Sequence, residues 1–497
     1  MKQGNLNIRC TEDYAVLYWD KPAAAPSGAE YTVSLNGEAI GRTDRTHFTI
    51  EGLSYGSAFR VDVVSGSYCI GSATLQFGRE KRRIDITAAP YFCKGDGHIL
   101  NTDNLQRAIN DCGADDILYV PAGDFLTGAL RLHSDLEIYL AKGAVLQGTT
   151  NIHDYSPRIP SRFEGTEMRC YSSLLNAGDM NHKTGPNCRN IIIRGRGTIC
   201  GGGQELARKI IEDERARIKS FLDDNRDLVE SCENNDTIPG RVRPRLINLS
   251  NCENVWISGI TLKNGPSWNV HMIYCDDIQT DHCTFVSEGV WNGDGWDPDS
   301  STNCTLFASE FSTGDDAVAI KSGKNPEGNE INRPCAHIRV FDCRSDCGHG
   351  ICIGSEMSGG VEDVQIWDCD LANSLSGIEI KATPKRGGYV RGVTVRDCIT
   401  PRVMLHSVPY NDDGMPAGAP PKLEHCFFER LTLTAEVQDH DRSRHDAAPI
   451  EIAGFDKPGY EVEDIVFKDI TITKPSVALP LGLCKGVTLS NLACVKE

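Results

Sequence analysis

The chain has 497 residues and a formal net charge of -18, from 51 Lys and Arg against 69 Asp and Glu. This charge argues against general binding to nucleic acid or to an anionic membrane, although a local basic pocket remains compatible with it. A single hydrophobic core rarely supports so long a chain, which predicts either several domains or an architecture that grows by repetition.

The first residues, "MKQGNLNIRC", contain no apolar signal segment, and no stretch approaches the ~18 apolar residues that a membrane span needs. These features predict a cytoplasmic protein with no membrane partner. The 21 cysteines are odd in number and spread along a large chain, so we interpret most of them as buried thiols in a reducing compartment. Cys343, Cys347 and Cys352 lie near His349, but their spacing does not suit a tetrahedral zinc site. We therefore expect no metal and no other cofactor.

Residues 1–84 are predicted to form a small β-sandwich. They contain short runs of alternating apolar and polar residues, such as "AVLYWDKP" and "EYTVSLNG", bounded by turn residues. The run with Trp19 before Pro22 resembles a fibronectin type III domain. Because no cluster of catalytic residue types accompanies it, we expect this domain to serve packing, spacing or an interface.

Residues 85–497 are predicted to form a solenoid. A pattern "x-N/D-V-x-I" recurs with steps of 23, 26, 34, 26 and 29 residues, and its first apolar residue is Val255, Ile278, Cys304, Ile338, Val364 and Val393. Short β-branched strands at this period, with Gly, Asn and Asp at the corners and no intervening helices, are typical of a parallel β-helix. Recurrent cysteines fit the interior of such coils, namely Cys252, Cys283, Cys343, Cys369 and Cys398.

A charged, helix-prone segment at residues 204–236 interrupts the coils. We interpret it as a surface insertion of solvated amphipathic helix. A lid beside an active cleft, or a subunit contact, is its functional alternative.

Three aspartates are candidates for chemistry. Asp294, in "NGDG", precedes Asp315 by 21 residues, which is about one coil, and Asp316 follows directly in "TGDDAVAIKSG". His349 in "CGHG" and Lys381 in "GIEIKATPKRGG" follow at intervals of 34 and 32 residues. This spacing predicts one polar stripe across neighbouring coils. A solenoid has no reason to align such groups except for a ligand, because a stripe of like charges costs stability.

The stripe predicts a glycosidase. Cleavage of a glycosidic bond needs one carboxylic acid to protonate the leaving oxygen and a second carboxylate as base or nucleophile. Crowded acids raise one another's proton affinity, so one of the three can stay protonated while the others are ionised. Asp297 and Asp299, on either side of Pro298, are interpreted as corner residues instead.

The motifs together resemble a known family. "RPRLINLSNCENVWISGITLKNGPSWNVHMI", "NGDGWDPDS", "TGDDAVAIKSG", "CGHG" and "IEIK" occur in the order and approximate spacing of polygalacturonases, glycoside hydrolase family 28, over roughly residues 85–495. The resemblance implies a right-handed parallel β-helix. It also implies hydrolysis of galacturonic-acid linkages in pectic oligosaccharides, with inversion at the anomeric carbon.

The resemblance carries over to particular residues. It implies that Asp315 is the general acid and that Asp294 and Asp316 activate water. His349 is similar to a histidine that hydrogen-bonds within the site, and Lys381 to a lysine that grips a substrate carboxylate or hydroxyl. Further substrate-binding candidates are Asn292, Lys321, Glu379, Arg386, Tyr410 and Arg162.

Two positions depart from the family pattern. The family's Asn-Thr-Asp is Asn292-Gly293-Asp294 here, and its usual Arg-Ile-Lys is Glu379-Ile380-Lys381. The second change removes a guanidinium fork that would pair a uronate and puts a repulsive carboxylate in its place. Glu379 either forms a salt bridge with Lys381 or Arg386, or marks a subsite for a neutral sugar. In the latter case the substrate would be a rhamnogalacturonan fragment or a substituted galacturonide.

Exo action is expected, since "SRFEGTEMRCYSSLLNAG" at residues 161–178 resembles a segment of the exo-acting bacterial members, and the fibronectin-like module occurs in that company. Arg162, Glu164, Trp268 and His271 are candidates for lining a closed cleft.

Two rival functions remain at this point. In a pectate-lyase-type enzyme the carboxylates would hold Ca²⁺ while a basic residue removes a proton. A non-catalytic carbohydrate-binding β-helix would instead need aromatic stacking platforms, of which a chain with 6 Trp has few. The pair Asp315-Asp316 together with the "GHG" motif favours the hydrolase. Assembly into a homo-oligomer is left open.

Overall fold

The computed structural model describes residues 3–4, 6–52, 56–76, 78, 80–410, 412–474 and 478–495. The chain divides into two compact units, Met1–Arg83 and Ile84–Glu497. The strand β9 (Arg82–Asp85) crosses the boundary between them.

The first unit is a small β-sandwich. Its antiparallel sheets have the strand orders β1-β8-β7-β4-β5 and β2-β3-β6. The strands are β1 (Gln3–Gly4), β2 (Leu6–Cys10), β3 (Tyr14–Trp19), β4 (Tyr31–Leu35), β5 (Glu38–Thr43), β6 (His47–Glu51), β7 (Ala58–Ser65) and β8 (Tyr68–Gln76). Trp19 and Tyr31 meet edge to face in the core, with ring centroids 5.2 Å apart. The predicted sandwich is therefore confirmed.

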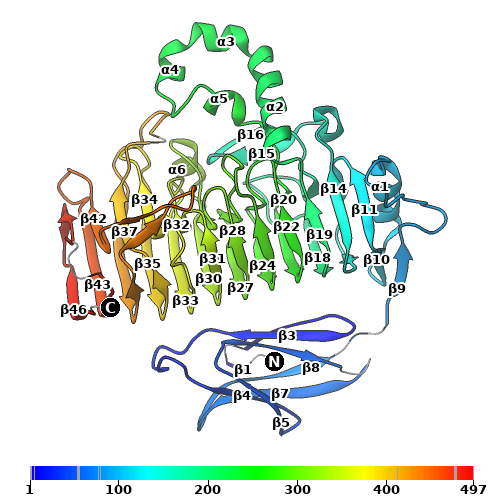
Figure 1. Cartoon of the computed structure of the whole chain (residues 1–497), viewed down its shortest axis with the longest axis horizontal. Coiled ribbons are helices and arrows are strands. Elements are labelled where there is room, and N and C mark those ends of the chain that lie inside the picture. Colours follow the sequence, from blue (N-terminus) through cyan, green and yellow to red (C-terminus); the bar gives the residue numbers. More distant parts are fainter. Residues whose placement is uncertain are drawn as a thin grey trace. The chain divides into compact units, whose positions relative to one another are not determined.

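The second unit is a parallel β-helix, as predicted (Figure 1). Consecutive strands turn from one parallel sheet to the next, so that each coil lays its strands on those of the coil before. Three long sheets result, and each neighbouring pair is hydrogen-bonded between coils rather than within one.

The strands of these sheets are short. The largest sheet contains β10 (Asp116–Val120), β13 (Leu136–Leu140), β18 (Cys188–Gly195), β21 (Cys252–Ser258), β24 (Asp276–Asp281), β27 (Thr302–Phe307), β30 (Cys335–Phe341), β33 (Val361–Trp367), β35 (Tyr389–Arg396), β36 (Ile399–Thr400), β38 (Lys422–Glu429), β39 (Thr432–Leu433), β43 (Val462–Ile472), β45 (Cys484–Lys485) and β46 (Thr488–Cys494). A narrow sheet contains β11 (Gly123–Thr127), β14 (Ala144–Gly148), β19 (Thr198–Cys200), β22 (Thr261–Lys263), β25 (Thr284–Val286), β28 (Glu310–Ser312) and β31 (Arg344–Cys347).

The third sheet, called the site sheet below, carries the candidate residues. It contains β12 (Leu130–Leu132), β17 (Leu175–Ala177), β20 (Ile247–Ser250), β23 (Val270–Ile273), β26 (Trp296–Asp299), β29 (Val318–Ile320), β32 (Gly350–Ile353), β34 (Gly377–Ala382), β37 (Val403–Ser407), β42 (Ile450–Ala453) and β44 (Leu481–Gly482). In the described part of the second unit, two hairpins lie outside the three sheets, β15 (Ile159–Phe163) with β16 (Thr166–Cys170) and β40 (Glu436–Gln438) with β41 (Arg444–Asp446).

The repeat read from the sequence is the register of the largest sheet. Val255 pairs with Ile278, Ile278 with Cys304, Ile338 with Val364, and Val364 with Val393. The residue before each aligned position has a left-handed backbone, with φ of 55° at residue 254, 55° at 277, 54° at 303, 59° at 337 and 51° at 363. Asn and Asp adopt this conformation at lower cost than other side chains, which explains the "N/D-V" signal.

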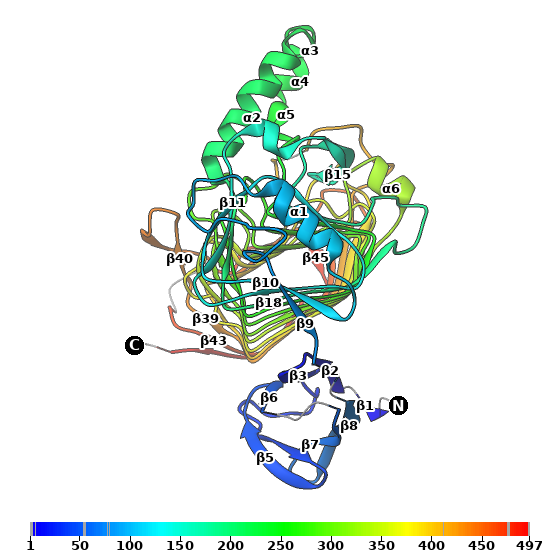
Figure 2. The ribbon, with the colours of Figure 1, turned by 90° about the vertical axis from the view of Figure 1, so that its right-hand side faces the viewer.

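The interior of the coils is one continuous hydrophobic core. The cysteines predicted to stack inside, Cys252, Cys283, Cys343, Cys369 and Cys398, all belong to it, and all 21 cysteines of the chain are free thiols. Burial of one Val, Ile or Leu side chain there contributes about 1.5–3 kcal/mol. The helix α1 (Thr102–Asp111) buries Leu105, Ala108 and Ile109 against the first coils and covers their open end (Figure 2).

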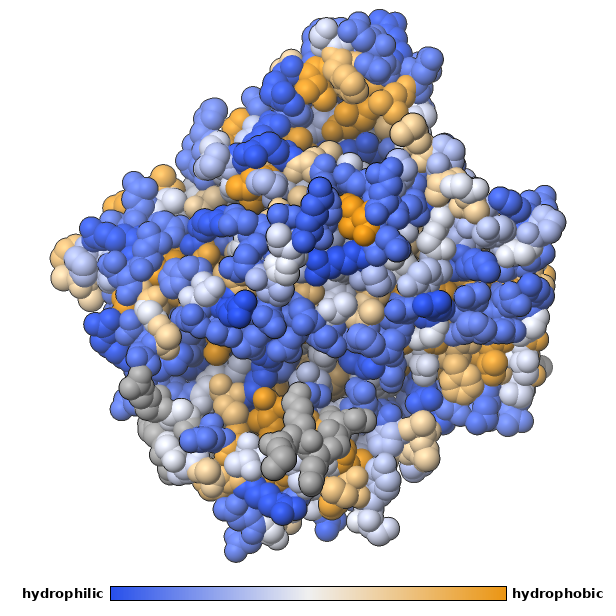
Figure 3. All heavy atoms as spheres, turned by 180° about the vertical axis from the view of Figure 1, so that it is seen from behind, coloured by the Kyte–Doolittle hydropathy of each residue, from blue (hydrophilic) through white to orange (hydrophobic). Residues whose placement is uncertain are grey.

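The predicted insertion is helical and projects from the β-helix (Figure 1). It comprises α2 (Gly203–Arg217), α3 (Lys219–Asp224), α4 (Arg226–Glu230) and α5 (Thr237–Gly240), while η1 (Ile152–Tyr155) and α6 (Glu327–Ile331) lie in other loops. Apolar side chains gather on this projection (Figure 3), where Ile211, Leu222, Val229 and Trp291 help to line a hollow of about 980 Å³. Among the described residues, no helix is long and apolar enough to cross a bilayer.

Candidate active site

Neighbouring coils bring the predicted residues together at one end of the strands of the site sheet. Asp294 precedes β26, Asp315 and Asp316 precede β29, and His349 precedes β32. The backbone N–H of Gly295 donates to the carbonyl of Asp316 at 3.0 Å, and that of His349 donates to the carbonyl of Asp315 at 3.0 Å. The predicted step of one coil between Asp294 and Asp315 is therefore confirmed.

The interval from His349 to Lys381 is not one coil, contrary to the prediction. Gly350 pairs with Gly377, so one coil spans 27 residues there, and Lys381 lies four residues further along β34. Its long side chain reaches back, however, and Nζ lies 3.3 Å from both carboxylate oxygens of Asp316. Lys381 thus joins the stripe through the length of its side chain rather than through its register.

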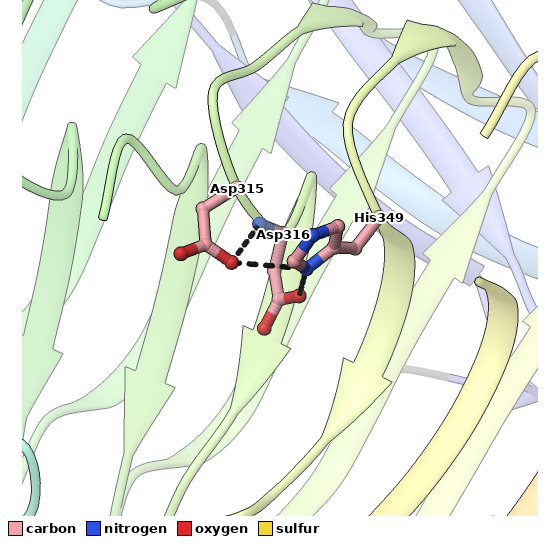
Figure 4. A group of neighbouring side chains, drawn as sticks. All are labelled: Asp315, Asp316 and His349. Atoms are coloured by element: carbon pink, nitrogen blue, oxygen red, sulfur yellow. Dashed lines mark hydrogen bonds and ion pairs between the residues drawn. The ribbon is translucent and has the colours of Figure 1, made fainter. Parts of the chain in front are cut away.

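His349 connects the two adjacent aspartates. Its Nδ1 lies 3.1 Å from an oxygen of Asp315 and 3.1 Å from an oxygen of Asp316 (Figure 4). Burial opposes a charge on the imidazole, but these two carboxylates outweigh it and raise the pKa of His349 to about 10. His349 is therefore an imidazolium at neutral pH.

The two aspartates beside His349 are ionised. Burial works to raise the pKa of each, but the charge of His349 holds the pKa of Asp315 below its ordinary value, and Lys381 with His349 does the same for Asp316. Asp316 is almost completely buried, whereas about a quarter of the Asp315 side chain is exposed. Asp315 is thus the more accessible of the pair.

Asp294 has the opposite tendency. Burial raises its pKa well above the ordinary value, and the charges of Asp297, Asp315 and Asp316 reinforce this, although Nζ of Lys321 lies only 3.1 Å from Oδ2 of Asp294. Burial likewise raises the pKa of Asp297 to about 7. The expectation that crowding raises the proton affinity of a carboxyl therefore agrees with these directions at Asp294 and Asp297, whereas the pKa of Asp315 is lowered instead.

Asp297 and Asp299 are not corner residues, contrary to the prediction. Both lie on β26, and both are completely buried. Pro298 fits this strand by using its carbonyl, which accepts a hydrogen bond from Lys321 N at 2.8 Å. Asp297 lies 3.4 Å from Nζ of Lys321, so it belongs to the charge network beneath Asp294.

Arg162 and Arg386 are not positioned to contact a substrate, which corrects two predictions. Both side chains are completely buried. Arg162 donates to Asp299 at 2.6 Å and also bonds Tyr274, whereas Arg386 donates to the side chain of Asn325 at 2.6 Å and to the carbonyl of Ser355 at 2.9 Å. These guanidinium groups hold loops and strands together beneath the surface.

The proposed lining residues Trp268 and His271 are also buried. Their rings meet edge to face at 4.7 Å, and the Trp268 ring lies 3.9 Å from Nζ of Lys321. Trp268 therefore makes a cation–π contact with Lys321. Burial lowers the pKa of His271 to about 3, so this histidine is neutral. Its Nε2 lies 3.3 Å from Oδ2 of Asp299.

Glu379 is buried and contacts His406, Lys381 and Cys352. Its carboxylate lies 2.7 Å from Nε2 of His406, on the next coil, and 3.7 Å from Nζ of Lys381. Burial works to raise its pKa, but the charges of Lys381 and His406 lower it to about 2. Of the two salt bridges considered for Glu379, the structure contains the one with Lys381, whereas Arg386 lies near Glu356 at 3.8 Å.

Asn292 and Tyr410 occupy the surroundings of the stripe. The side-chain oxygen of Asn292 accepts from Arg243 Nη2 at 2.6 Å. Tyr410 is 40% exposed, and its pKa is raised by burial and by the nearby charges of Glu379 and Asp316, against the effect of Lys381. Tyr410 therefore presents a neutral hydroxyl beside Lys381.

Sequence reasoning missed several groups around the site. Arg243 lies in a quoted motif, "RPRLINLS", and is completely buried, where it donates to Asn292 and stacks on Trp291 at 4.1 Å. His406 follows Lys381 by one coil, and the register pairs the two residues directly. A coil-by-coil alignment of the site sheet could have found His406, whereas nothing in the sequence distinguishes Arg243 from an exposed arginine.

Ion pairs join loops from distant parts of the chain at the rim of the site. Arg241, just after α5, contacts Glu164 at 2.8 Å and Asp413 at 2.7 Å, and Lys324 also pairs with Asp413. Burial, followed by the charges of Asp315 and Glu164, raises the pKa of Glu233. The charge of Asp315 therefore acts on the end of the helical insertion.

One group of side chains could hold a metal ion. Among the described residues, the ligand atoms of Asp315, Asp316 and His349 alone fit this criterion, lying within 4.8 Å of one another. In this structure Nδ1 of His349 lies 3.1 Å from an oxygen of each aspartate. Cys343, Cys347 and Cys352 do not form a common centre, since Cys343 and Cys347 bond backbone carbonyls and Cys352 contacts Glu379.

The chain is similar to a probable polygalacturonase of Vitis vinifera, with 34% identity over 317 residues, which are 61% of this chain and 58% of that protein. It is also similar to an exo-poly-alpha-D-galacturonosidase of Dickeya chrysanthemi, with 25% identity over 97% of this chain and 89% of that protein. The structure of a family 28 exopolygalacturonase of Yersinia enterocolitica has the same fold, with a TM-score of 0.80 at 21% identity, over 98% of this chain and 96% of that chain.

The family suggested by the sequence motifs is confirmed by a family model. That model, for glycosyl hydrolases family 28, matches residues 112–408, which is more than half of the chain and includes the whole carboxylate stripe. The chain therefore belongs to glycosyl hydrolases family 28, and its chemistry is that of a glycosidase.

Proposed function

We propose that the protein is an inverting, exo-acting hydrolase of galacturonate-containing pectic oligosaccharides. The observation that carries this proposal is the arrangement of Asp294, Asp315 and Asp316 on neighbouring coils, with His349 and Lys381 beside them. The names of the Vitis and Dickeya relatives support a galacturonide substrate, and the Dickeya name supports exo action.

The proton for the leaving group is held by Asp315 and His349 together. The imidazolium lies 3.1 Å from the Asp315 carboxylate, so the pair contains one proton although it resides on nitrogen. When a glycosidic oxygen approaches Asp315, the proton passes from His349 through Asp315 to that oxygen, and the bond from oxygen to the anomeric carbon breaks.

The water that attacks the anomeric carbon is activated from the other side. Asp316 is ionised, held by Lys381 and His349, and takes one proton from the water as its oxygen bonds to carbon. Asp294 hydrogen-bonds the same water and orients it toward the anomeric carbon, while Asp316 takes the proton. Attack opposite the departing oxygen inverts the anomeric configuration.

A different pectic linkage is the second candidate, because Glu379 stands where the resemblance expects an arginine. Its carboxylate is paired with His406 and Lys381, so it does not face the substrate as an isolated negative charge, and a galacturonate at this position stays the first candidate.

Product analysis tests the proposal. Purified protein is incubated with trigalacturonate, rhamnogalacturonan fragments and substituted galacturonides, and the products are separated by anion-exchange chromatography. Release of single galacturonate units from trigalacturonate supports it. Cleavage of the other substrates alone would show that one subsite accepts a sugar other than galacturonate. An unsaturated product that absorbs in the ultraviolet would indicate a lyase.

A further inference from the structure

Arg402 carries a charge that nothing in the described part of the chain neutralises directly. Its Nε is buried and has no hydrogen-bond partner, and its guanidinium forms no hydrogen bond or ion pair with any described residue. The backbone, by contrast, is held firmly, since the carbonyl of Arg402 accepts from Ile378 N at 3.2 Å and from Thr400 Oγ1 at 3.2 Å. The backbone of Arg402 is therefore held in place, and its side chain is available to bind an anion.

Arg402 belongs to the same face of the β-helix as the catalytic stripe. It precedes β37, where Ile378 pairs with Val403 and Lys381 pairs with His406. Val403 and Leu405 belong to the core. Because side chains alternate along a strand, Arg402 and His406 point outward, on the same face of the site sheet as Glu379 and Lys381 of β34. Arg402 thus stands one coil beyond the strand that carries Lys381.

The carboxylates near Arg402 do not pair with it. Glu379 is occupied by His406 at 2.7 Å and by Lys381 at 3.7 Å, and Glu451 lies 3.9 Å from the other nitrogen of His406. Glu379, Glu451 and Tyr410 nevertheless act on its charge, although burial has the largest effect and lowers its pKa. A partly buried guanidinium without a paired carboxylate costs stability, and it is suited to an anionic ligand at this face.

We propose that Arg402 binds the carboxylate of a galacturonate unit in the subsite beside β34 and β37, and so supplies from the next coil the guanidinium that residue 379 lacks. The planar fork of arginine matches a carboxylate with two parallel hydrogen bonds. The exposed Tyr410 offers a hydroxyl at the same place. This inference rests on the proposed function and names the carboxylate-recognition residue of that site.

The test compares Arg402→Gln, Arg402→Lys and a control, Arg396→Gln. Arg396 is also partly buried in the β-helix, but it lies on β35 in the largest sheet and pairs with Glu429 at 3.5 Å. Steady-state kinetics on trigalacturonate should give a KM at least about tenfold higher for Arg402→Gln, with kcat nearly unchanged, because a charge-assisted hydrogen bond is lost. Arg402→Lys should recover part of the loss, and Arg396→Gln should retain the wild-type KM.

Thermal unfolding separates binding from a structural role. Without ligand, Arg402→Gln should unfold at the wild-type temperature or above it, since the substitution removes an unpaired buried cation. Trigalacturonate should stabilise this variant less than the wild type. An unchanged KM, or a lower unfolding temperature together with a loss of kcat alone, would overturn the assignment of Arg402. A wild-type protein that neither binds nor cleaves trigalacturonate would instead overturn the proposed function.

Discussion

The imidazole Nδ1 of His349 lies 3.1 Å from a carboxylate oxygen of Asp315, across one step of the β-helix. This distance makes the two groups one proton-holding unit, in which the proton resides on the nitrogen at neutral pH. The arrangement explains how a carboxylate with a lowered pKa can serve a reaction that needs an acid.

Asp315→Asn should abolish cleavage of trigalacturonate, lowering kcat by roughly 10²–10⁴-fold or more, because the leaving oxygen loses its proton donor. On an aryl galacturonide with a good leaving group, the same variant should retain much of its activity, since that departure needs no proton. Asp294→Asn is the matched control and should be impaired on both substrates. If Asp294→Asn alone is rescued by the aryl substrate, the acid is Asp294, as the raised pKa of that residue would then indicate.

His349→Gln should move the acid limb of the pH profile of kcat/KM to higher pH. Burial raises the pKa values of Asp315 and Asp316, and the charge of His349 lowers them. Removal of that charge therefore raises both pKa values, so the base protonates at a higher pH during acidification. An acid limb that stays in place, or moves to lower pH, would contradict the coupling.

Asn254→Ala should lower the free energy of unfolding by about 1–2 kcal/mol, because residue 254 has a φ of 55°. Asn254→Gly relieves the strain and should cost less. Urea unfolding monitored by tryptophan fluorescence measures both. Equal losses of unfolding free energy for the two variants would show that the left-handed backbone does not explain the preference for Asn at residue 254.

The sequence predicted the β-helix and its register well because the corners demand a left-handed residue once per coil. Asn254, Asp277, Asn303 and Asp363 are therefore visible as a periodic signal. The β-sandwich was visible for a similar reason, since alternation of apolar residues follows directly from the geometry of a strand.

A site residue could be predicted only where its residue type suits the reaction and its spacing in the sequence equals one coil. Asp294 and Asp315 lie one coil apart in the sequence and in the structure. Lys381 was placed by a wrong interval, because a long side chain can reach the stripe from a position beyond it. Arg162 was assigned to substrate binding because of its charge. Its burial could not be predicted from the local sequence, because it depends on the ion pair with Asp299, 137 residues away.

Arg162→Met should destabilise the fold by about 3–5 kcal/mol, because it leaves the completely buried Asp299 without its main cation. Arg131→Met is the matched control, since the ion pair of Arg131 with Asp179 is exposed and contributes about 0–1 kcal/mol. Unfolding midpoints in urea give the comparison. A stable Arg162→Met protein with a raised KM would restore Arg162 as a substrate-binding residue.

The anomeric configuration of the first product distinguishes water attack from attack by a carboxylate of the enzyme. Proton NMR of trigalacturonate during the first minutes of hydrolysis distinguishes the newly released anomer before it mutarotates. This anomer should have the configuration opposite to the cleaved linkage, as water attack aided by Asp316 and Asp294 requires. A product that retains the configuration of the linkage would contradict water attack, because one of these carboxylates would then have attacked the sugar itself.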